Sequence, residues 1–294
     1  MNPVVLYFAS GESLYTGAVV LGLAIVLSRL VRGPWTLLFR NVAAYLSLAM
    51  IVMACPPFPW VIDALFLAAF GVWFGVSNMT ASRQAWAKLR LVSSLALLFL
   101  LVALSGIEFR HRRMPAIAGQ PDDHLVIIGD SISSGVDPRI PAWPVVFQEL
   151  TGILVKNLAR PGASIAEGID MARGITPTDH VVLIELGGND LLSSVPSKEF
   201  GEALELLLSD LVAPGRTVVM LELPLIPPMI TYGQTQRRIA AKYGVHLIPK
   251  RLFANVIGGA NATTDGIHLS KLGGRRMAEL MAGALSGVLK QPAR

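Results

Sequence analysis

Two stretches in the second half of the sequence carry side chains that acyl transfer uses. Ser131 follows a four-residue apolar run and a Gly-Asp pair, whereas Asp265 and His268 stand three residues apart near the carboxyl end. A serine hydroxyl is a poor nucleophile unless a base lies within hydrogen-bond reach. An imidazole oriented by a carboxylate is such a base. These residue types predict a serine nucleophile activated by an acid–imidazole pair that one short loop carries.

Gly162 and Asn189, which lie between these stretches, fit the same chemistry. Each residue also has an ordinary structural explanation. Ser131 could cap a helix, Gly162 could form a turn, Asn189 could cap a loop and a lone His268 could be structural. A nucleophile, a backbone donor, a side-chain amide and an acid–imidazole pair are together the parts of an acyl-transfer site. We therefore adopt the catalytic interpretation.

The elements that must position these residues follow from the hydrophobic pattern after residue 123. Five apolar runs predict strands at 125–129, 153–158, 181–186, 217–223 and 245–249. Amphipathic stretches predict helices at 142–150, 165–173, 198–211, 234–243 and 271–289. Alternation of strand and helix predicts a parallel sheet with helices on both faces, an α/β fold of three layers. Right-handed crossovers then bring the loops that follow the strands to one edge.

The four stretches resemble the signature blocks of the GDSL, or SGNH, hydrolase family. Gly-Asp-Ser131 matches the first block, Gly162 the second, Gly-Gly-Asn189-Asp the third and Asp265-x-x-His268 the last, in the family's order. The Glu185-to-Asp190 stretch, Trp143-Pro144 and Asp-Gly-Ile-His268 make the chain most similar to the periplasmic thioesterase–lysophospholipase type. The resemblance implies a flavodoxin-like SGNH fold, and it covers about residues 125–270. The first half of the chain has no counterpart in that soluble type.

This resemblance implies roles for individual residues. Ser131, His268 and Asp265 are expected to form the triad. The backbone N–H groups of Ser131 and Gly162 and the side-chain amide of Asn189 are expected to form the oxyanion hole. We expect no cofactor and no metal, because no metal-ligand spacing and no nucleotide fingerprint occurs. Four buried or capping carboxylates are expected to be structural: Asp130, Asp190, Glu185 and Glu222.

The first half of the chain has a different composition. Overall the sequence is 53% hydrophobic and 15% charged, against about 25% charged in soluble proteins, and the shortfall is concentrated in residues 1–108. We predict an all-α membrane region of about four helices at 1–108, a linker at 109–123 and a hydrolase domain at 124–294. The candidate spans are 14–30, 35–55, 60–76 and 91–107, close to the shortest lengths that cross a bilayer. Arg40 makes the second span doubtful, because it could snorkel to the interface or mark a re-entrant segment.

The distribution of basic residues predicts the orientation. Six positive charges lie in or beside the two loops that follow the first and third spans, and three follow the fourth span: Arg29, Arg32, Arg40, Arg83, Lys88 and Arg90, then Arg110, Arg112 and Arg113. The positive-inside rule places the first group in the cytoplasm and the hydrolase domain outside. We therefore expect a protein integral to a bacterial inner membrane, with its catalytic domain on the periplasmic side. An odd number of spans would reverse this orientation.

These features lead to three candidate functions. The first is a membrane-anchored serine acyl-ester hydrolase resembling esterases, lysophospholipases and thioesterases, with Met229 and Ile230 in one wall of an acyl-chain groove. The second is an O-acetyl esterase or acetyltransferase that acts on a cell-surface glycan. The third is a non-catalytic scaffold, which the intact set of catalytic residues disfavours. Although the net charge is +5, no basic stripe interleaved with aromatics suggests nucleic acid. The sequence leaves open the acyl chain, the leaving group, protein partners and the oligomeric state.

Overall fold

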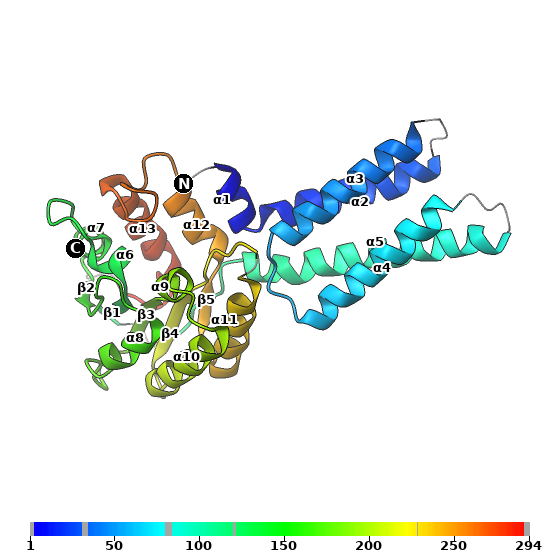
Figure 1. Ribbon diagram of the computed structural model, residues 1–294. Coiled ribbons are helices and arrows are strands. Elements are labelled where there is room, and N and C mark those ends of the chain that lie inside the picture. Colours follow the sequence, from blue (N-terminus) through cyan, green and yellow to red (C-terminus); the bar gives the residue numbers. More distant parts are fainter. Residues whose placement is uncertain (1–2, 31–34, 80–83, 120–121, 228, 291–294) are drawn as a thin grey trace. The chain divides into compact units, whose positions relative to one another are not determined.

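The computed structural model describes residues 3–30, 35–79, 84–119, 122–227 and 229–290, and it divides into two compact units (Figure 1). The helical unit holds Gly11–Arg112 and a short piece that begins at Ile226. The α/β unit holds the residues up to Ser10, Arg113–Leu225 and the chain from Met229 onward. The amino-terminal residues therefore belong with the α/β unit, although the sequence pattern placed them in the membrane region.

Four long helices form the helical unit, and they coincide with the four predicted spans. They are α2 (Glu12–Leu30), α3 (Thr36–Met53), α4 (Trp60–Asn78) and α5 (Gln84–Arg112). Each is long and apolar enough to cross a membrane by length and composition. Helix α5 continues through residues 109–112, where we predicted a linker, and its Arg112 binds Glu12 of α2 at 3.0 Å. The ion pair explains why the polar last turn stays helical.

Arg40 lies inside an unbroken α3, so the stretch that it made doubtful is one continuous helix of 18 residues. Its guanidinium is buried and donates to the Ser77 carbonyl at 2.9 Å and to Asn78 Oδ1 at 2.7 Å, both at the carboxyl end of α4. A cation beside a helix carboxyl end is favoured by the helix dipole. Arg32 and Arg83, which contributed to the predicted orientation, lie outside the described residues.

The α/β unit is built on a sheet of five parallel strands in the order β2-β1-β3-β4-β5. The strands are β1 (His124–Gly129), β2 (Leu154–Asn157), β3 (Val181–Glu185), β4 (Thr217–Leu221) and β5 (His246–Ile248). Each predicted strand is present, and most are shorter by one or two residues. This order reverses direction between β1 and β3, and ligands of doubly wound sheets bind at such a switch point.

Helices cover both faces of the sheet. Five correspond to predicted helices: α7 (Trp143–Thr151), α8 (Ile165–Ala172), α10 (Ser197–Leu211), α11 (Ile230–Tyr243) and α13 (Lys271–Ala284). Four were not predicted: α1 (Pro3–Ala9), α6 (Ser131–Ser134), α9 (Gly188–Leu192) and α12 (Lys250–Gly258). Each of these four has nine residues or fewer and lies outside the amphipathic stretches named above.

Alternate residues of the central strands face different layers. Leu125 and Ile127 belong to a core that also contains Trp143 and Phe147 of α7 and Met277 of α13. On the other face Ile128 lies beside Gly168 of α8, where an added Cβ would come within 2.6 Å of Leu186. Period-two alternation in strands produces this division. The buried sheet is a rigid support whose loops carry the polar residues.

Candidate active site

The structure brings the three residues of the predicted triad together at the carboxyl edge of the sheet. Ser131 is the first residue of α6, directly after β1, and its Oγ lies 3.1 Å from His268 Nε2. The other ring nitrogen, Nδ1, lies 2.6 Å from Asp265 Oδ2. Both distances are hydrogen-bond distances. The arrangement connects a hydroxyl, an imidazole and a carboxylate in the order that nucleophile activation requires.

The loop before α13 holds Asp265 in a fixed orientation. Its Oδ1 accepts hydrogen bonds from the backbone N–H groups of Ile267 at 2.9 Å and His268 at 2.8 Å. The His268 ring and these two amides hold the pKa of Asp265 well below its usual range. The carboxylate therefore stays ionised at neutral pH, where it can orient the ring and stabilise an imidazolium.

Two backbone donors flank the nucleophile. Ser131 N–H is at the first position of α6, where a helix offers no internal acceptor. Gly162 has φ +76°, a left-handed conformation, and the space where its Cβ would stand is empty to 4 Å. Within the described part of the chain neither N–H has a hydrogen-bond acceptor. The left-handed backbone conformation therefore favours glycine at position 162.

Asn189 connects the loops that carry the other two donors. Its Nδ2 donates to Asp130 Oδ2 and to the Ala163 carbonyl, both at 3.0 Å. Asp130 precedes Ser131, and Ala163 follows Gly162. The Asn189 amide therefore links the loop that carries Ser131 to the loop that carries Gly162. An amide nitrogen has two protons, and both have acceptors here. A third acceptor, such as an oxyanion, must therefore displace one of these two acceptors or share a proton with it.

A pair of buried carboxyl groups supports the nucleophile turn. Asp130 Oδ1 accepts from Ile132 N–H at 2.9 Å and caps α6, which carries Ser131. Glu185, at the end of β3, accepts from Asp130 N–H at 3.3 Å and Ser133 Oγ at 2.8 Å. Burial raises the pKa of Glu185 well above its usual range, and the Asp130 carboxylate beside it raises it further. The Glu185 carboxyl group therefore holds its proton to a higher pH than an exposed glutamate does.

Trp143 completes this support from a second helix. Its indole Nε1 donates to Ser133 Oγ at 3.1 Å, and Ser133 in turn donates to Glu185. The Trp143 ring is buried in the core between α7 and the sheet. A chain of hydrogen bonds thus runs from α7 through α6 to β3 beside Ser131. The roles of Ser133 and Trp143 were not apparent in the sequence, because their partners are distant along the chain.

A cavity of about 230 Å³ opens beside Ser131 and His268. Its walls come from the segment 131–143 that follows the nucleophile and from the segment 264–274 that contains His268. Gly162 and Asn189 do not line it. A larger groove of about 540 Å³ lies on the helical unit between α2 and α3, but its lining offers no nucleophile–base pair. The smaller cavity is therefore the one with access to the chemistry.

Met229 and Ile230, the predicted acyl-wall residues, lie at the start of α11 and do not line this cavity. Helix α11 begins four residues earlier than the amphipathic pattern indicated. Loop segment 135–142, which contributes several cavity residues, was not singled out in the sequence. Its position immediately after the nucleophile was the only signal that could have identified it.

The remaining polar residues in the strand-end loops have structural partners. Asp190 Oδ2 accepts from Ile165 N–H at 3.0 Å at the start of α8, and burial raises the Asp190 pKa. Glu222 binds Arg237 at 2.6 Å and accepts from Lys250 N–H at 3.1 Å. These contacts agree with the structural roles predicted for both carboxylates.

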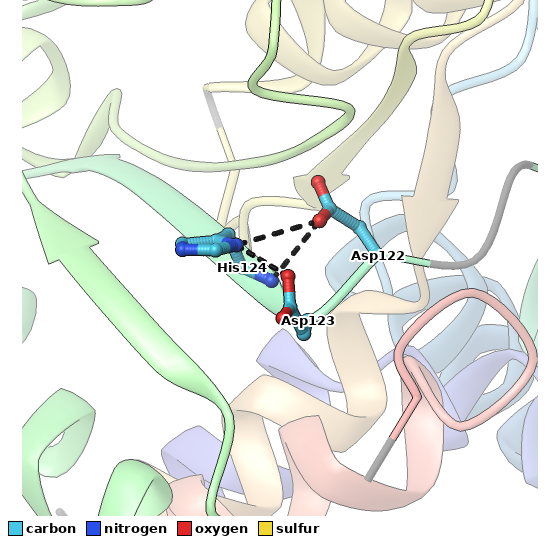
Figure 2. A group of neighbouring side chains, drawn as sticks. All are labelled: Asp122, Asp123 and His124. Carbon is cyan, nitrogen blue, oxygen red and sulfur yellow. Dashed lines mark hydrogen bonds and ion pairs between the residues drawn. The ribbon is translucent and has the colours of Figure 1, made fainter. Parts of the chain in front are cut away.

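One cluster of potential metal ligands lies at the opposite edge of the sheet, where β1 begins (Figure 2). His124 Nδ1 lies 2.5 Å from Asp123 Oδ1 and 3.6 Å from Asp122 Oδ1. Asp122 also accepts from the backbone N–H groups of His124 at 3.2 Å and His180 at 3.1 Å. The Asp122 carboxylate therefore fixes the amino ends of β1 and β3, which is a structural role. This edge is the length of a strand away from Ser131.

Comparison with known proteins gives a match over the region that contains this site. Residues 127–276 match the model of the "GDSL-like Lipase/Acylhydrolase family", which is half of the chain. The matched segment contains the three triad residues as well as Gly162 and Asn189. Helices α2 to α5 lie outside it.

Two relatives illustrate the extent of the similarity. An arylesterase of Vibrio mimicus is 30% identical over 125 residues, which is 40% of this chain and 61% of the relative. The match therefore spans less than two thirds of that protein. The crystal structure of TesA superposes with a TM-score of 0.50 at 26% identity, over 56% of this chain and 99% of TesA. The α/β unit thus corresponds to almost the whole of TesA, and the helical unit is additional.

Proposed function

The chain belongs to the GDSL-like lipase/acylhydrolase family, and from this membership we propose that it is a membrane-anchored serine hydrolase of acyl esters. The observation that carries the proposal is the continuous line of hydrogen bonds from Ser131 Oγ through His268 to Asp265. Ester hydrolysis needs a nucleophile, a base that becomes an acid and donors for an oxyanion. Each of these has a candidate within the matched segment.

In the first half of the reaction, Ser131 Oγ attacks the carbonyl carbon of the ester while its proton passes to His268 Nε2. Asp265 stabilises the imidazolium that forms. The tetrahedral intermediate collapses when the bond between the carbon and the leaving oxygen breaks. That oxygen takes the proton from His268 Nε2, the alcohol departs and an acyl-Ser131 ester remains. In the second half water repeats the attack and the acid leaves.

The oxyanion formed in each step needs donors that are directed at it before the reaction starts. We assign Ser131 N–H, Gly162 N–H and Asn189 Nδ2 to this role. The first two have no other acceptor within the described chain, and Asn189 must shift from Asp130 or from the Ala163 carbonyl to take part. Asp130 and Glu185 remain positioning residues, because neither touches the reacting atoms in this scheme.

The helical unit supports a location in the membrane and an orientation. Arg29 donates to Ser94 and Arg40 donates to Asn78, and both arginines belong to the larger group of six basic residues. Arg112, which binds Glu12, belongs to the smaller group of three. The positive-inside rule therefore favours a cytoplasmic position for the larger group and a periplasmic position for the catalytic domain.

Ester hydrolysis by the full chain in detergent tests the proposed activity. The substrates are p-nitrophenyl esters with acyl chains from acetyl to dodecanoyl, and the control is Ser131→Ala. We expect turnover to fall by about 10⁴-fold or more in the variant. A rate that rises with acyl length would support the apolar start of α11, Met229 and Ile230, as an acyl wall. An acetyl preference would favour action on glycan O-acetyl groups, and turnover without Ser131 would refute the mechanism.

Labelling of single cysteines tests the orientation separately. In a Cys55→Ser background, a membrane-impermeant maleimide should label Lys290→Cys in spheroplasts and Lys88→Cys only in inverted vesicles. Both positions are exposed. The opposite pattern would place the α/β unit in the cytoplasm and leave the proposed chemistry intact.

A further inference from the structure

The groove between α2 and α3 in the helical unit, about 540 Å³ in volume, has two different ends. Most of its lining residues are apolar, and its polar ones are Ser28, Thr36 and Arg40. Ser28 is near the end of α2 and Thr36 begins α3, whereas Val20 and Ala43 line the groove about 10 Å further along these helices. The groove is therefore polar beside the connection between the two helices and apolar along the rest of its length.

Arg40 brings a buried positive charge to the wall of this groove. The residue is 6% exposed, and a guanidinium stays protonated in proteins. Its protons go to neutral oxygens: the Ser77 carbonyl at 2.9 Å, and Oδ1 of Asn41 at 2.8 Å and of Asn78 at 2.7 Å. One Nη1 proton of Arg40 has no acceptor among the described residues. These hydrogen bonds hold the side chain in place but supply no counter-charge.

Two further arginines lie in the same network of neutral oxygens. Arg90 of α5 donates to the carbonyl of Met79, the residue that follows α4, at 2.7 Å. The carboxyl end of a helix carries about half of a negative elementary charge, and here two guanidinium groups share it. Arg29 donates to Ser94 Oγ at 3.0 Å, and Ser94 donates to the Arg90 carbonyl at 2.7 Å. The positive charge around the polar end of the groove therefore exceeds what the helix end compensates.

The carboxylates of the helical unit are too distant to pair with these arginines. Residues 13–62 and 64–107 contain no Asp or Glu. Glu12 begins α2, Asp63 is in the first turn of α4 and Glu108 is close to the end of α5. Each lies more than about 20 Å along its helix from the arginine-bearing end, and an ion pair needs about 4 Å. The helical unit therefore holds no carboxylate that could compensate the charge of Arg40.

From the apolar groove and this uncompensated charge we propose that the groove binds one acyl chain of an anionic phospholipid whose phosphate lies against Arg40. Guanidinium groups form strong, charge-assisted hydrogen bonds to phosphate, and basic pockets between membrane helices bind anionic headgroups. The length of the groove fits one leaflet, about 15 Å of hydrocarbon. Trp35 lines its polar end and is 65% exposed, and tryptophan is enriched at headgroup level. The inference rests on the proposed membrane location and not on the ester chemistry.

Lipid binding by the full chain in detergent tests the proposal. A Ser131→Ala background prevents hydrolysis of a bound lipid, and native mass spectrometry counts the lipids that stay bound. The probes are dioleoyl phosphatidylglycerol and dioleoyl phosphatidylcholine at equal concentration, which share acyl chains and a phosphodiester but differ in net charge. We expect phosphatidylglycerol to fill one site before phosphatidylcholine binds. Glycerol 3-phosphate, a headgroup without chains, should not displace it.

The first pair of variants tests the charge. Arg40→Gln removes the positive charge and keeps a side chain that donates hydrogen bonds, and it should weaken phosphatidylglycerol binding by about ten-fold or more. Lys88→Gln is the control, because it removes an equal charge from an exposed position on α5 that does not line the groove. Its effect should stay within about two-fold. Since Arg40 also joins α3 to α4, resistance to SDS is measured for both variants.

The second pair fills the groove and leaves every arginine in place. Leu23 and Leu37 are each 54% exposed, and of the two it is Leu23 that lines the groove. Leu23→Trp should weaken phosphatidylglycerol binding, and Leu37→Trp should leave it unchanged. The loss should be smaller than for Arg40→Gln, because an acyl chain excluded from the groove finds equally apolar surroundings elsewhere. This pair decides the outcome if Arg40→Gln lowers the resistance to SDS.

Three results would overturn the proposal. Equal binding of the two lipids would exclude recognition of net charge. Displacement by glycerol 3-phosphate would show that the headgroup binds without the groove. Equal binding by Leu23→Trp and Leu37→Trp would place the lipid elsewhere. Failure of the proposed function is a separate result, since the wild type would then lack Ser131-dependent hydrolysis of p-nitrophenyl acetate while its lipid binding persisted.

Discussion

In the α/β unit the strands β1, β3 and β4 are buried over nearly all their length, whereas in the helical unit many large apolar side chains, such as Leu23, Phe39 and Val102, face outward. Polar residues differ as well. In the α/β unit they meet at the carboxyl ends of β1 and β3, and in the helical unit pairs such as Arg40 with Asn78 and Arg112 with Glu12 lie near the ends of the helices. This contrast fits the proposed location of the helical unit in a membrane, because lipid accepts apolar surface and water does not.

This comparison predicts that a change at one unit's polar residues leaves the other unit intact. The largest effect is expected from Asp265→Asn. Loss of the carboxylate lets the His268 ring adopt the wrong tautomer, and kcat should fall by about 10⁴-fold. The thermal stability of the helical unit should not change. Asp170→Asn, an exposed carboxylate on α8, is the matched control, and a similar loss in both variants would contradict the assignment.

The second-largest effect is expected from loss of the Asn189 amide, one of the three proposed oxyanion donors. Asn189→Ala should lower kcat by about 10² to 10³-fold with a smaller change in KM, as the removal of one donor does elsewhere. Because Asn189 also bridges Asp130 and the Ala163 carbonyl, melting of the variant should be measured alongside its kinetics. Asn255→Ala on the exposed side of α12 serves as control. A rise in KM alone would show that Asn189 binds substrate and does not stabilise an oxyanion.

A third experiment disturbs the helical unit without touching the chemistry. Gly17 of α2 faces α3, and an added Cβ would lie 2.8 Å from the Ser47 carbonyl and 2.9 Å from Ile51 Cγ1. Gly17→Leu should destabilise this unit by about 1–3 kcal/mol, seen as lower resistance to SDS. Gly71→Leu on α4 is the control, since nothing lies within 4 Å of its Cβ position. Esterase activity per folded molecule should be the same in both.

The smallest effect is expected from the buried carboxyl pair. Burial raises the pKa of Glu185 above its ordinary 4.5, so the unfolded chain loses this proton at lower pH than the folded protein does. Stability therefore falls as pH rises from about 4.5 to the higher folded value. Glu185→Gln removes this dependence, and its melting temperature relative to wild type should rise by a few degrees between about pH 5 and pH 8.

Glu202→Gln on the exposed side of α10 is the control for that measurement. Its melting temperature relative to wild type should stay constant over the same range. A constant difference for Glu185→Gln as well would mean that burial does not raise the pKa of Glu185.

The features that were predictable from the sequence are those that depend on neighbours along the chain. The apolar runs identified five strands and four long helices, because burial of a strand or span leaves a continuous local pattern. Ser131, Gly162, Asn189, Asp265 and His268 stood out because each follows a strand or lies in a short loop with a distinctive neighbour. Their convergence followed from the parallel order of the strands.

Other features depended on residues that are far apart in sequence and were decided only by the tertiary structure. The register of β1 on β3 pairs Gly129 with Glu185 and so puts that carboxyl beneath Asp130 and Ser133. Packing of α7 brings the Trp143 indole to the same serine. The cavity forms where segment 131–143 meets segment 264–274. A local pattern carries no record of which distant segment will be its neighbour, so register and packing alone determine these contacts.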